Sequence, residues 1–549
     1  MNKNKSTSYI ILFFIICLFG ILGLNSLNPS KPNYDDLSKI NVNNLMTHIS
    51  QIAKEPHSIY DVEAKGKVRD YLTSELNKLG ASPKIYEYND VYVKRSDSYE
   101  DLQNIYAEIK GKSDSYIMLV THYDSSRAKA ERYAEKDGSH GAADAGYGLS
   151  TILETLRVIK ENNIELENGI KILFTDGEEA GLLGAKEAVN EAEIFNGVNY
   201  LINLEARGTS GPAVMFETSP NNSAIVDLYS STDKAFSYSI TPEIYRLLPN
   251  GTDFTVFLEN KIPGINISVL DGMENYHTPN DNPNNLSYES MQHYGDQVLP
   301  IVTEFVSNSK YSDSSALISN DDSIFFSLGN LFIKYSKATN YILISLILIC
   351  IIYLYMNLKS KNLIKVFKYT FINLVYTVIS MGIAYFLTRV LAIINGRQFK
   401  ITYLPLIKYE STILILFILI TFIGYIFTIK KFTHNLKEKN EYLIGSLVLL
   451  LLLSIILTLS LPGASYITVF PGVLISITSV ITKALKDKYN LSCIMLIPIA
   501  LITLLFVPTV YLFNAALTLG GLCANILFVM IGFISIISSS IFIKGINTY

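Results

Sequence analysis

Five short stretches of the chain each carry one or two side chains that can bind a metal ion. They lie at residues 122–124, 141–144, 175–179, 203–205 and 276–277. Their two imidazoles and three carboxylates are about what a pair of bridged zinc ions requires, because zinc binds nitrogen and oxygen ligands and a catalytic site leaves one position open for water. Glu178, directly before the candidate ligand Glu179, is free to act as a base. The set predicts a two-metal hydrolase.

Taken singly, each stretch also has an ordinary structural explanation. His122 after a strand could be a satisfied buried histidine, and Asp144 in a glycine-rich turn could cap the next helix. Glu178 and Glu179 could complement a helix dipole. His277, which precedes Thr-Pro, could be a turn residue. The hydrolase interpretation depends on all five stretches occurring together.

The apolar residues of the chain are concentrated in two places. Hydrophobic residues make up 49% of the sequence, and the excess lies in one segment near the start and in almost everything after Asn340. This composition is too apolar for a soluble enzyme. We therefore predict an N-terminal transmembrane anchor over 1–29, a soluble domain over 30–336 that contains all five stretches, and a membrane domain over 337–549. The net charge of −4 gives no argument for a nucleic-acid partner.

The first apolar segment, Tyr9 to Leu24, follows Lys3 and Lys5. A cleaved signal peptide has the same charged start and apolar middle. No small-residue cleavage site follows the segment, so an uncleaved anchor is the favoured interpretation. With either interpretation, the chain that follows is predicted to be exported.

About seven further segments in the C-terminal region are candidate membrane spans, and most have the ~20 apolar residues that a bilayer requires. They lie at 341–356, 370–394, 411–429, 442–461, 466–482, 491–513 and 516–543.

Lysines crowd alternate connections between these segments. They lie at 359–368, 430–439 and 483–488, whereas the opposite connections are less basic, although Arg397, Lys400 and Lys408 lie in one of them. Because basic loops stay in the cytoplasm, both termini are predicted there and the soluble domain outside. The richness in Ile, Asn, Lys and Tyr favours a bacterial plasma membrane; in a eukaryote the domain would be lumenal.

The soluble region alternates helical and strand-like patterns. Strand-like runs lie at 84–88, 104–109, 116–120 and 170–174, and helical spacing at 68–79, 150–159 and 180–190. Short apolar strands alternating with helices predict an α/β fold, a mixed or parallel sheet flanked by helices on both faces. Reactive groups in such folds collect past the carboxyl ends of the strands. His122, residues 176–179 and Glu205 each directly follow a strand-like run.

The five stretches together resemble a known site. They read THYDS at Thr121, GAADAGYG at Gly141, TDGEEAGLLGA at Thr175, NLEARGTSGPAVMFET at Asn203 and YHTPNDNPNNL at Tyr276. Over about residues 45–305, the chain resembles the dizinc aminopeptidases of peptidase family 28, clan MH, which have a three-layer zinc-peptidase fold. The layout of anchor, domain and many spans is similar to the membrane-bound branch of endoplasmic reticulum metallopeptidases and vacuolar membrane proteases.

The resemblance implies a role for each site residue. Asp144 would bridge two zinc ions, with His122 and Glu205 completing one site and Glu179 and His277 the other. Asp124 would orient His122 from behind. Glu178 would be the catalytic base, and the Tyr276 hydroxyl would steady the oxyanion. One position departs from the family, which usually has Asp or Asn where this chain has Ala145.

Three functions are compatible with these observations. The favoured one is a membrane-anchored zinc aminopeptidase that acts on exported peptides. A second is glutaminyl cyclisation on the same fold, but relatives with that activity use one zinc, and this chain keeps the full ligand set. A third is a non-enzymatic scaffold, receptor or transamidase-complex subunit, roles that related domains take after losing ligands. The expected partners are a peptide substrate and the lipid bilayer; the oligomeric state stays open.

Overall fold

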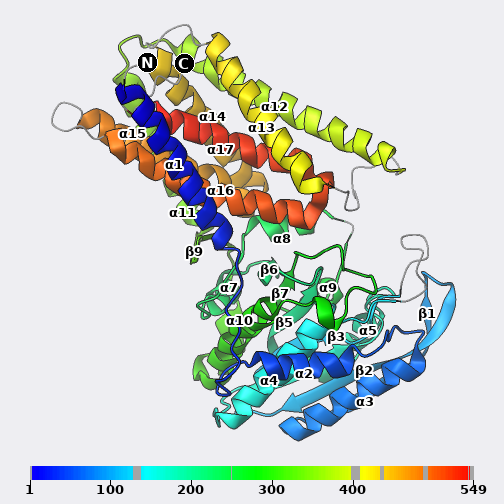
Figure 1. Ribbon diagram of the computed structural model, residues 1–549. Helices are drawn as coiled ribbons and strands as arrows, with labels where there is room; N and C mark the ends of the chain where they lie inside the picture. Colours follow the sequence, from blue (N-terminus) through cyan, green and yellow to red (C-terminus); the bar gives the residue numbers. More distant parts are fainter. Residues whose placement is uncertain are drawn as a thin grey trace. The chain divides into compact units, whose positions relative to one another are not determined.

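The computed structural model describes residues 3–127, 138–248, 250–396, 409–432, 438–485, 492–541 and 543. The chain forms two compact units (Figure 1). One unit is Asn28–Ser323, and the other combines Met1–Leu27 with Ile324–Tyr549. This division differs from the predicted boundary at 336, because the hairpin of β8 (Ser323–Leu328) and β9 (Leu331–Ser336) groups with the apolar helices that follow it.

The unit Asn28–Ser323 contains a seven-stranded mixed sheet in the order β1-β2-β4-β3-β5-β7-β6. The four strands β4, β3, β5 and β7 are parallel, whereas β1, β2 and β6 pair antiparallel at the two edges. The strands are β1 (Lys84–Val93), β2 (Ser98–Ile109), β3 (Tyr116–His122), β4 (Gly169–Thr175), β5 (Val198–Ala206), β6 (Val214–Thr218) and β7 (Gly264–Val269). The predicted mixed sheet is confirmed.

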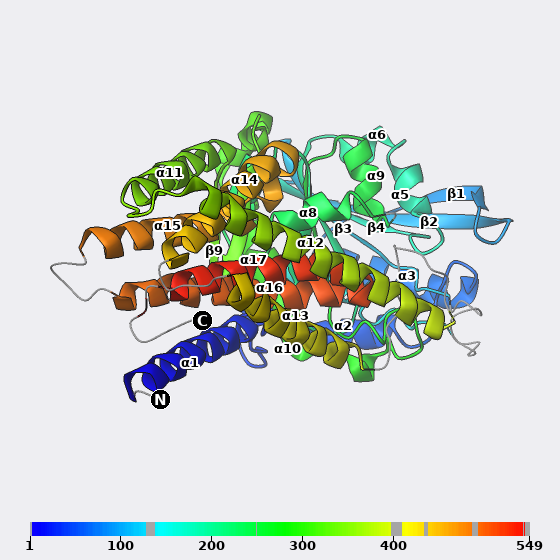
Figure 2. The same ribbon diagram turned by 90° about the horizontal axis from the view of Figure 1, so that it is seen from above.

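Helices cover both faces of this sheet, which explains why its central strands are buried along their length. Every residue of β3, β4 and β7 is buried. One layer contains α2 (Val42–Ile52), α3 (Val62–Leu79), α4 (Gly146–Glu161) and α10 (Tyr288–Ser307), which contact one another. The opposite layer contains α5 (Leu183–Ala188), α6 (Ala192–Phe195) and α9 (Asp253–Glu259), and Figure 2 shows the strands between these layers.

Two further helices complete the unit at the β6 edge of the sheet. They are α7 (Ser223–Tyr229) and α8 (Ile240–Tyr245), and α8 contacts β6. The helix predicted over 180–190 is shorter in the structure, where α5 covers Leu183–Ala188. Gly181, at φ +132°, lies just before it and favours a turn over a helix at this point.

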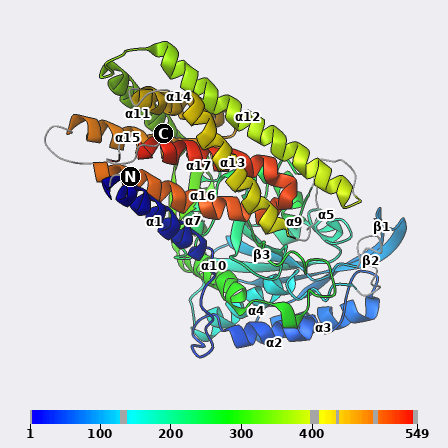
Figure 3. The same cartoon turned by 45° about the horizontal axis from the view of Figure 1, so that its top comes forward.

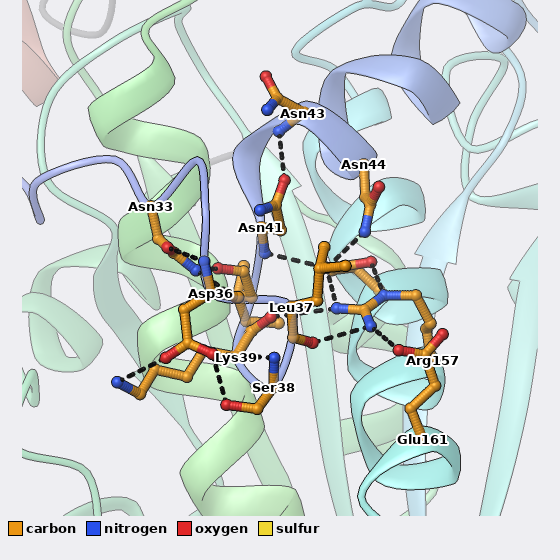
Figure 4. Close-up of polar contacts among 12 residues, drawn as sticks. Asn33, Asp36, Leu37, Ser38, Lys39, Asn41, Asn43, Asn44, Arg157 and Glu161 are labelled. Carbon is orange, nitrogen blue, oxygen red and sulfur yellow. Dashed lines mark hydrogen bonds and ion pairs between the residues drawn. The ribbon is translucent and has the colours of Figure 1, made fainter.

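The segment that leads into the unit is fastened to α4 by one buried carboxylate (Figure 4). Glu154 Oε1 accepts the backbone N–H of Asn41 at 2.9 Å and the Arg157 guanidinium at 2.6 Å. The same guanidinium donates to the carbonyls of Leu37 at 2.9 Å and Lys39 at 3.1 Å. Because both partners of the ion pair also bind backbone groups, they fix the path of residues 37–41 over α4.

The second unit consists mainly of apolar helices, as predicted. They are α1 (Lys3–Asn25), α11 (Lys337–Met356), α12 (Leu363–Ile394), α13 (Glu410–Phe432), α14 (Lys439–Ser460), α15 (Tyr466–Ala484), α16 (Leu496–Leu517) and α17 (Leu522–Ser540). The described residues contain seven candidate membrane spans by length and composition, the last of which, Cys493–Ser540, includes both α16 and α17. Helix α1 packs beside α16 (Figure 3).

The lysine-bearing connections of this unit lie at one end of it. Lys365 at the start of α12 binds Glu438, just before α14, at 2.8 Å. Lys483 near the end of α15 donates to the carbonyl of Asn357, just after α11, at 3.0 Å. Three connections that alternate along the chain therefore meet at one end of this unit. Several other basic residues of that prediction lie outside the described residues: Arg397, Lys400, Lys408, Lys437, Lys486 and Lys488.

Candidate metal centre

The candidate ligands converge because their strands are parallel neighbours. Strand β3 ends at His122, β4 ends at Thr175 just before the acidic turn, and β5 ends at Ala206 just after Glu205. The carboxyl ends of parallel strands meet at one edge of a sheet. The remaining ligands arrive on loops, Asp144 before α4 and His277 after β7.

Two groups of three side chains share one carboxylate. His122, Asp144 and Glu205 form one group and Asp144, Glu179 and His277 the other, and the ligand atoms of each group lie within 4.8 Å of one another. Asp144 Oδ1 lies 3.1 Å from His122 Nε2, while Asp144 Oδ2 lies 3.2 Å from His277 Nε2. The five side chains predicted as ligands are thus brought together, with Asp144 in the central position.

The His122 ring is oriented through its second nitrogen. His122 Nδ1 lies 2.8 Å from the backbone carbonyl of Asp124, and a carbonyl can only accept. Nδ1 therefore carries a proton, which leaves Nε2, facing Asp144 and Glu205, as the nitrogen that can bind a metal. The Asp124 carboxylate lies farther from this ring, at 3.6 Å. Asp124 is beside His122 as predicted, but its main-chain oxygen makes the closer contact.

The Asp124 carboxylate instead holds the acidic turn. It accepts the backbone N–H of Glu178 at 3.0 Å and that of Glu179 at 3.3 Å. Glu178 belongs to neither group of candidate ligands. Burial, followed by the negative charge of Glu205, raises the pKa of Glu178 well above its usual range. A half-buried carboxylate beside the ligands but outside both groups has the placement of a base.

The second group contains two polar atoms without hydrogen-bond partners. His277 Nε2 lies 2.7 Å from Glu179 Oε1, yet both atoms are buried and neither has a hydrogen-bond partner within the described part of the chain. His277 adopts the left-handed region at φ +58°, a strained conformation that is common at functional sites. The Tyr276 ring stacks on its imidazole with centroids 3.7 Å apart. Burial raises the pKa of the Tyr276 hydroxyl well above its usual range, so it remains a donor.

Burial and neighbouring charges shift the pKa values of these groups in different directions. Burial would lower the pKa of His277, but Glu179 and then Asp144 outweigh it and raise the pKa to about 9. Burial raises the pKa of Glu205 to about 8 despite the opposing charge of His122. Burial would also raise the pKa of Asp144, yet the neighbouring imidazoles of His122 and His277 hold it well below its usual range. The protons on the flanking groups are ones that a bound metal displaces.

A buried aspartate that the sequence did not single out positions the Asp144 loop. Asp281 Oδ1 accepts the backbone N–H of Ala143 at 2.7 Å, and Oδ2 accepts that of Asp144 at 3.3 Å. Ser139 Oγ donates to the same carboxylate at 3.0 Å. Ala145 is 3% exposed and offers no side-chain cap to α4, so Asp281 supplies the polar support in this loop.

A chain of buried amides leads from Glu205 to a second carboxylate. Asn203 Nδ2 donates to Glu205 Oε1 at 2.9 Å and to Asn266 Oδ1 at 3.1 Å. Asn266 Nδ2 donates in turn to Glu217 Oε2 at 3.2 Å. Burial raises the pKa of Glu217 to about 7. The only indication of this carboxylate in the sequence was that Glu217, a polar residue, occupies a position of a short strand whose side chain points inward.

Comparison with known proteins agrees with this site. A buried group of imidazoles and carboxylates at the carboxyl edge of a mixed sheet defines a metallohydrolase-like α/β domain. Residues 104–302, which include all five candidate ligands, match the model of Peptidase family M28. This match agrees with the resemblance to peptidase family 28 that the sequence motifs predicted.

Two curated relatives share part of their length with this chain. A vacuolar membrane protease of Candida dubliniensis is 27% identical over 329 residues, which cover 57% of this chain and 33% of the relative. The mouse endoplasmic reticulum metallopeptidase 1 is 25% identical over 267 residues, or 48% of this chain and 28% of the relative. The chain thus matches about a third of the length of these relatives.

Solved structures align with about half of the chain. A zinc-dependent exopeptidase from Parabacteroides distasonis aligns with 48% of this chain and 98% of its own, at 22% identity and a TM-score of 0.40. A glutaminyl cyclase from Fimbriiglobus ruber aligns with 50% of this chain and 97% of its own, at 16% identity and a TM-score of 0.41.

Proposed function

We propose that the chain is a membrane-anchored metallopeptidase with two zinc ions per chain. His122, Asp144 and Glu205 would hold one ion, and Asp144, Glu179 and His277 the other. The observation that carries this proposal is the position of Asp144, whose two carboxylate oxygens each face a different imidazole. One carboxylate shared between two ligand groups is the arrangement that a bridged pair of ions requires.

The residues fit zinc on two grounds. The donor set of imidazole nitrogens and carboxylate oxygens is one that zinc accepts. In addition, His277 Nε2 and Glu179 Oε1 are buried without hydrogen-bond partners in the described part of the chain, a costly state that a shared cation relieves. When bound, the two ions supply Lewis-acid activation of water and polarisation of the scissile carbonyl.

The protein groups then perform the proton transfers and the positioning. Glu178 takes the proton from the attacking water and passes it to the leaving amine. Asp124 fixes the position of Glu178 through the backbone N–H that it accepts at 3.0 Å. The Tyr276 hydroxyl, held beside the site by stacking on His277, donates a hydrogen bond to the developing oxyanion.

The finer assignment is an aminopeptidase that removes N-terminal residues from exported peptides. Its support is the motif resemblance, together with relatives that are named as membrane proteases. The lysine-bearing connections at one end of the helical unit support a cytoplasmic end there, with the M28 domain outside the cytoplasm. We further propose a bacterial plasma membrane as its location.

The test is an assay of the purified full chain with zinc in detergent. Its substrates are a panel of aminoacyl reporter peptides, each paired with the same peptide blocked by an N-terminal acetyl group. Hydrolysis of the free-amine peptides alone is expected. Cleavage of both forms contradicts the aminopeptidase assignment, and cyclisation of an N-terminal glutamine without hydrolysis contradicts the peptidase.

A further inference from the structure

Arg207 lies on the same side of the sheet as the candidate ligand Glu205. Its backbone N–H donates to Val269 at 3.0 Å and so continues the pairing of β5 with β7 beyond Ala206. Alternate residues of a strand point to the same face, and the hydrogen bond of Asn203 to Glu205 identifies that face. Arg207 is therefore the next side chain outward, just past Glu205.

The base of the Arg207 side chain is held firmly. Gly208 follows it, and a Cβ at that position would meet the backbone oxygen of Asp271 at 2.1 Å. The loop is thus packed backbone to backbone directly after Arg207, while the β-pairing fixes the residue itself. The backbone that carries the Arg207 side chain is therefore fixed.

The Arg207 charge acts on the pKa of two tyrosines, Tyr245 and Tyr276. Burial raises the pKa of Tyr245, and the Arg207 charge opposes that shift. Burial likewise raises the pKa of Tyr276, which stacks on the candidate ligand His277, and the Arg207 charge again opposes that shift. Tyr245 belongs to α8, and its ring packs on Phe216 of β6 with centroids 4.9 Å apart. From its place after β5, Arg207 lies next to Glu205 at the edge of the metal centre.

Arg207 is half-buried, yet its guanidinium has no hydrogen bond, ion pair or ring contact among the described residues. The other described arginines of the unit Asn28–Ser323 each have at least one such contact. They are Arg69, Arg95, Arg127, Arg157 and Arg246. An arginine in a partly desolvated position is normally paired with an anion. The missing partner is then expected to arrive with the substrate.

We propose that the Arg207 guanidinium binds a carboxylate of the substrate beside the metal centre. This inference rests on the proposed peptidase function and narrows its substrate class to acidic or very short peptides. A guanidinium and a carboxylate form two parallel hydrogen bonds. The carboxylate has two possible sources, the C-terminus of a dipeptide or the side chain of Asp or Glu next to the scissile bond.

The test measures binding of peptides that cannot be hydrolysed. In each, the peptide bond of a dipeptide is replaced by CH2–NH, and titration calorimetry is performed on the zinc-loaded full chain in detergent. Leu-Leu with a free carboxylate is compared with its carboxamide, and Leu-Glu amide with Leu-Gln amide. The wild type is expected to bind the acid at least about 10-fold more tightly in one of the two pairs. The pair that shows the preference identifies the source.

Variants connect that preference to Arg207. Arg207→Met should abolish the preference for the acid over the amide probe. Arg207→Lys should keep only part of that preference, because lysine retains the charge but lacks the paired donors of the guanidinium. Arg246→Met, an exposed arginine on the neighbouring turn, should keep it in full. If Arg207→Met does not retain zinc, Arg207→Lys alone decides. Equal affinities in both pairs, or an unchanged preference in the Arg207 variants, overturn the proposal.

This design separates the inference from the function on which it rests. A wild type that prefers the acid probe but does not hydrolyse Leu-Leu contradicts the peptidase and leaves the carboxylate subsite standing. A wild type that hydrolyses Leu-Leu but binds both members of each pair equally leaves the peptidase standing and overturns the subsite.

Discussion

The carboxylate of Asp124 accepts the backbone N–H of Glu178 at 3.0 Å, and its second oxygen accepts that of Glu179 at 3.3 Å. One side chain at the end of β3 thus fixes both the proposed base and a proposed ligand, which follow β4. Asp124 also places its backbone carbonyl 2.8 Å from His122 Nδ1. It therefore couples three functional side chains from two neighbouring strands.

Asp124→Asn is expected to weaken zinc binding about 10- to 100-fold and to lower kcat by at least about 10-fold. The amide can still accept one of the two backbone hydrogen bonds, but its NH2 group faces the other N–H. Zinc affinity is measured by competition with a chelator, and kcat on the best reporter peptide. Asp70→Asn, which changes a side chain that is 73% exposed, is the matched control. If Asp124→Asn has the zinc affinity and the kcat of the wild type, the contact of the Asp124 carboxylate with the backbone of Glu178 and Glu179 is dispensable.

Glu178→Gln separates chemistry from metal binding. Glu178 lies outside both ligand groups, so the variant should keep its zinc. Its kcat should fall by at least ~10²-fold, the low end for general-base catalysis. Glu179→Gln provides the contrast, because it changes a proposed ligand and should lose zinc as well. Near-normal turnover in Glu178→Gln would mean that another group moves the proton.

Glu217→Gln should change how stability depends on pH. The pKa of Glu217 in the folded protein is about 7, above its ordinary 4.5. The folded state therefore binds the proton on Glu217 more tightly than the unfolded state does. Consequently, the free energy of unfolding of the protein falls as the pH rises from 4.5 to 7. A shift of this size corresponds to roughly 3 kcal/mol. Glutamine cannot lose a proton and can still accept from Asn266, so the variant should gain stability over the wild type across this interval.

The measurement is the difference in melting temperature between wild type and Glu217→Gln from pH 5 to 8. The melting temperatures of the two proteins are compared at each pH because metal binding itself depends on pH and affects both proteins alike. Glu63→Gln, at a side chain that is 87% exposed, serves as control. A difference for Glu217→Gln that stays constant over this range would refute the assigned cause.

Reporter fusions test the orientation of the chain. Three lysine-bearing connections meet at one end of the helical unit, which favours a cytoplasmic location for that end. A reporter that is active only outside the cytoplasm should work when fused after residue 336 and fail when fused after Tyr549. Activity of a cytoplasmic reporter after residue 336 would reverse the topology, and the substrates would then be cytosolic peptides.

The parts of the fold and site that sequence predicted are those with local signals. The apolar runs of β3 and β4 indicated buried parallel strands. Because His122 and Glu205 each directly follow a strand-like run, they were predicted at the ends of strands. The structure brings these residues together with Asp144. Long apolar segments likewise predicted the helices of the second unit, since span length is itself a local property.

The parts that sequence did not predict depend on contacts between distant segments. Asp281 supports Asp144 across 137 positions of the chain. Glu217 connects to Asn266 across 49 positions, through the pairing of β6 with β7. No local pattern distinguishes such a carboxylate from an ordinary surface residue. The β8–β9 hairpin was assigned to the soluble domain because its composition is ordinary, whereas its packing groups it with the helices.

The most direct test of the central claim is the metal content of the purified protein. Asp144 presents one oxygen to each imidazole, so elemental analysis of active wild-type protein should find about two zinc ions per chain. Asp144→Asn should lose most of both ions together, whereas His277→Ala should lose mainly one. Active wild-type protein with a single zinc ion, or with none, would contradict the two-metal account.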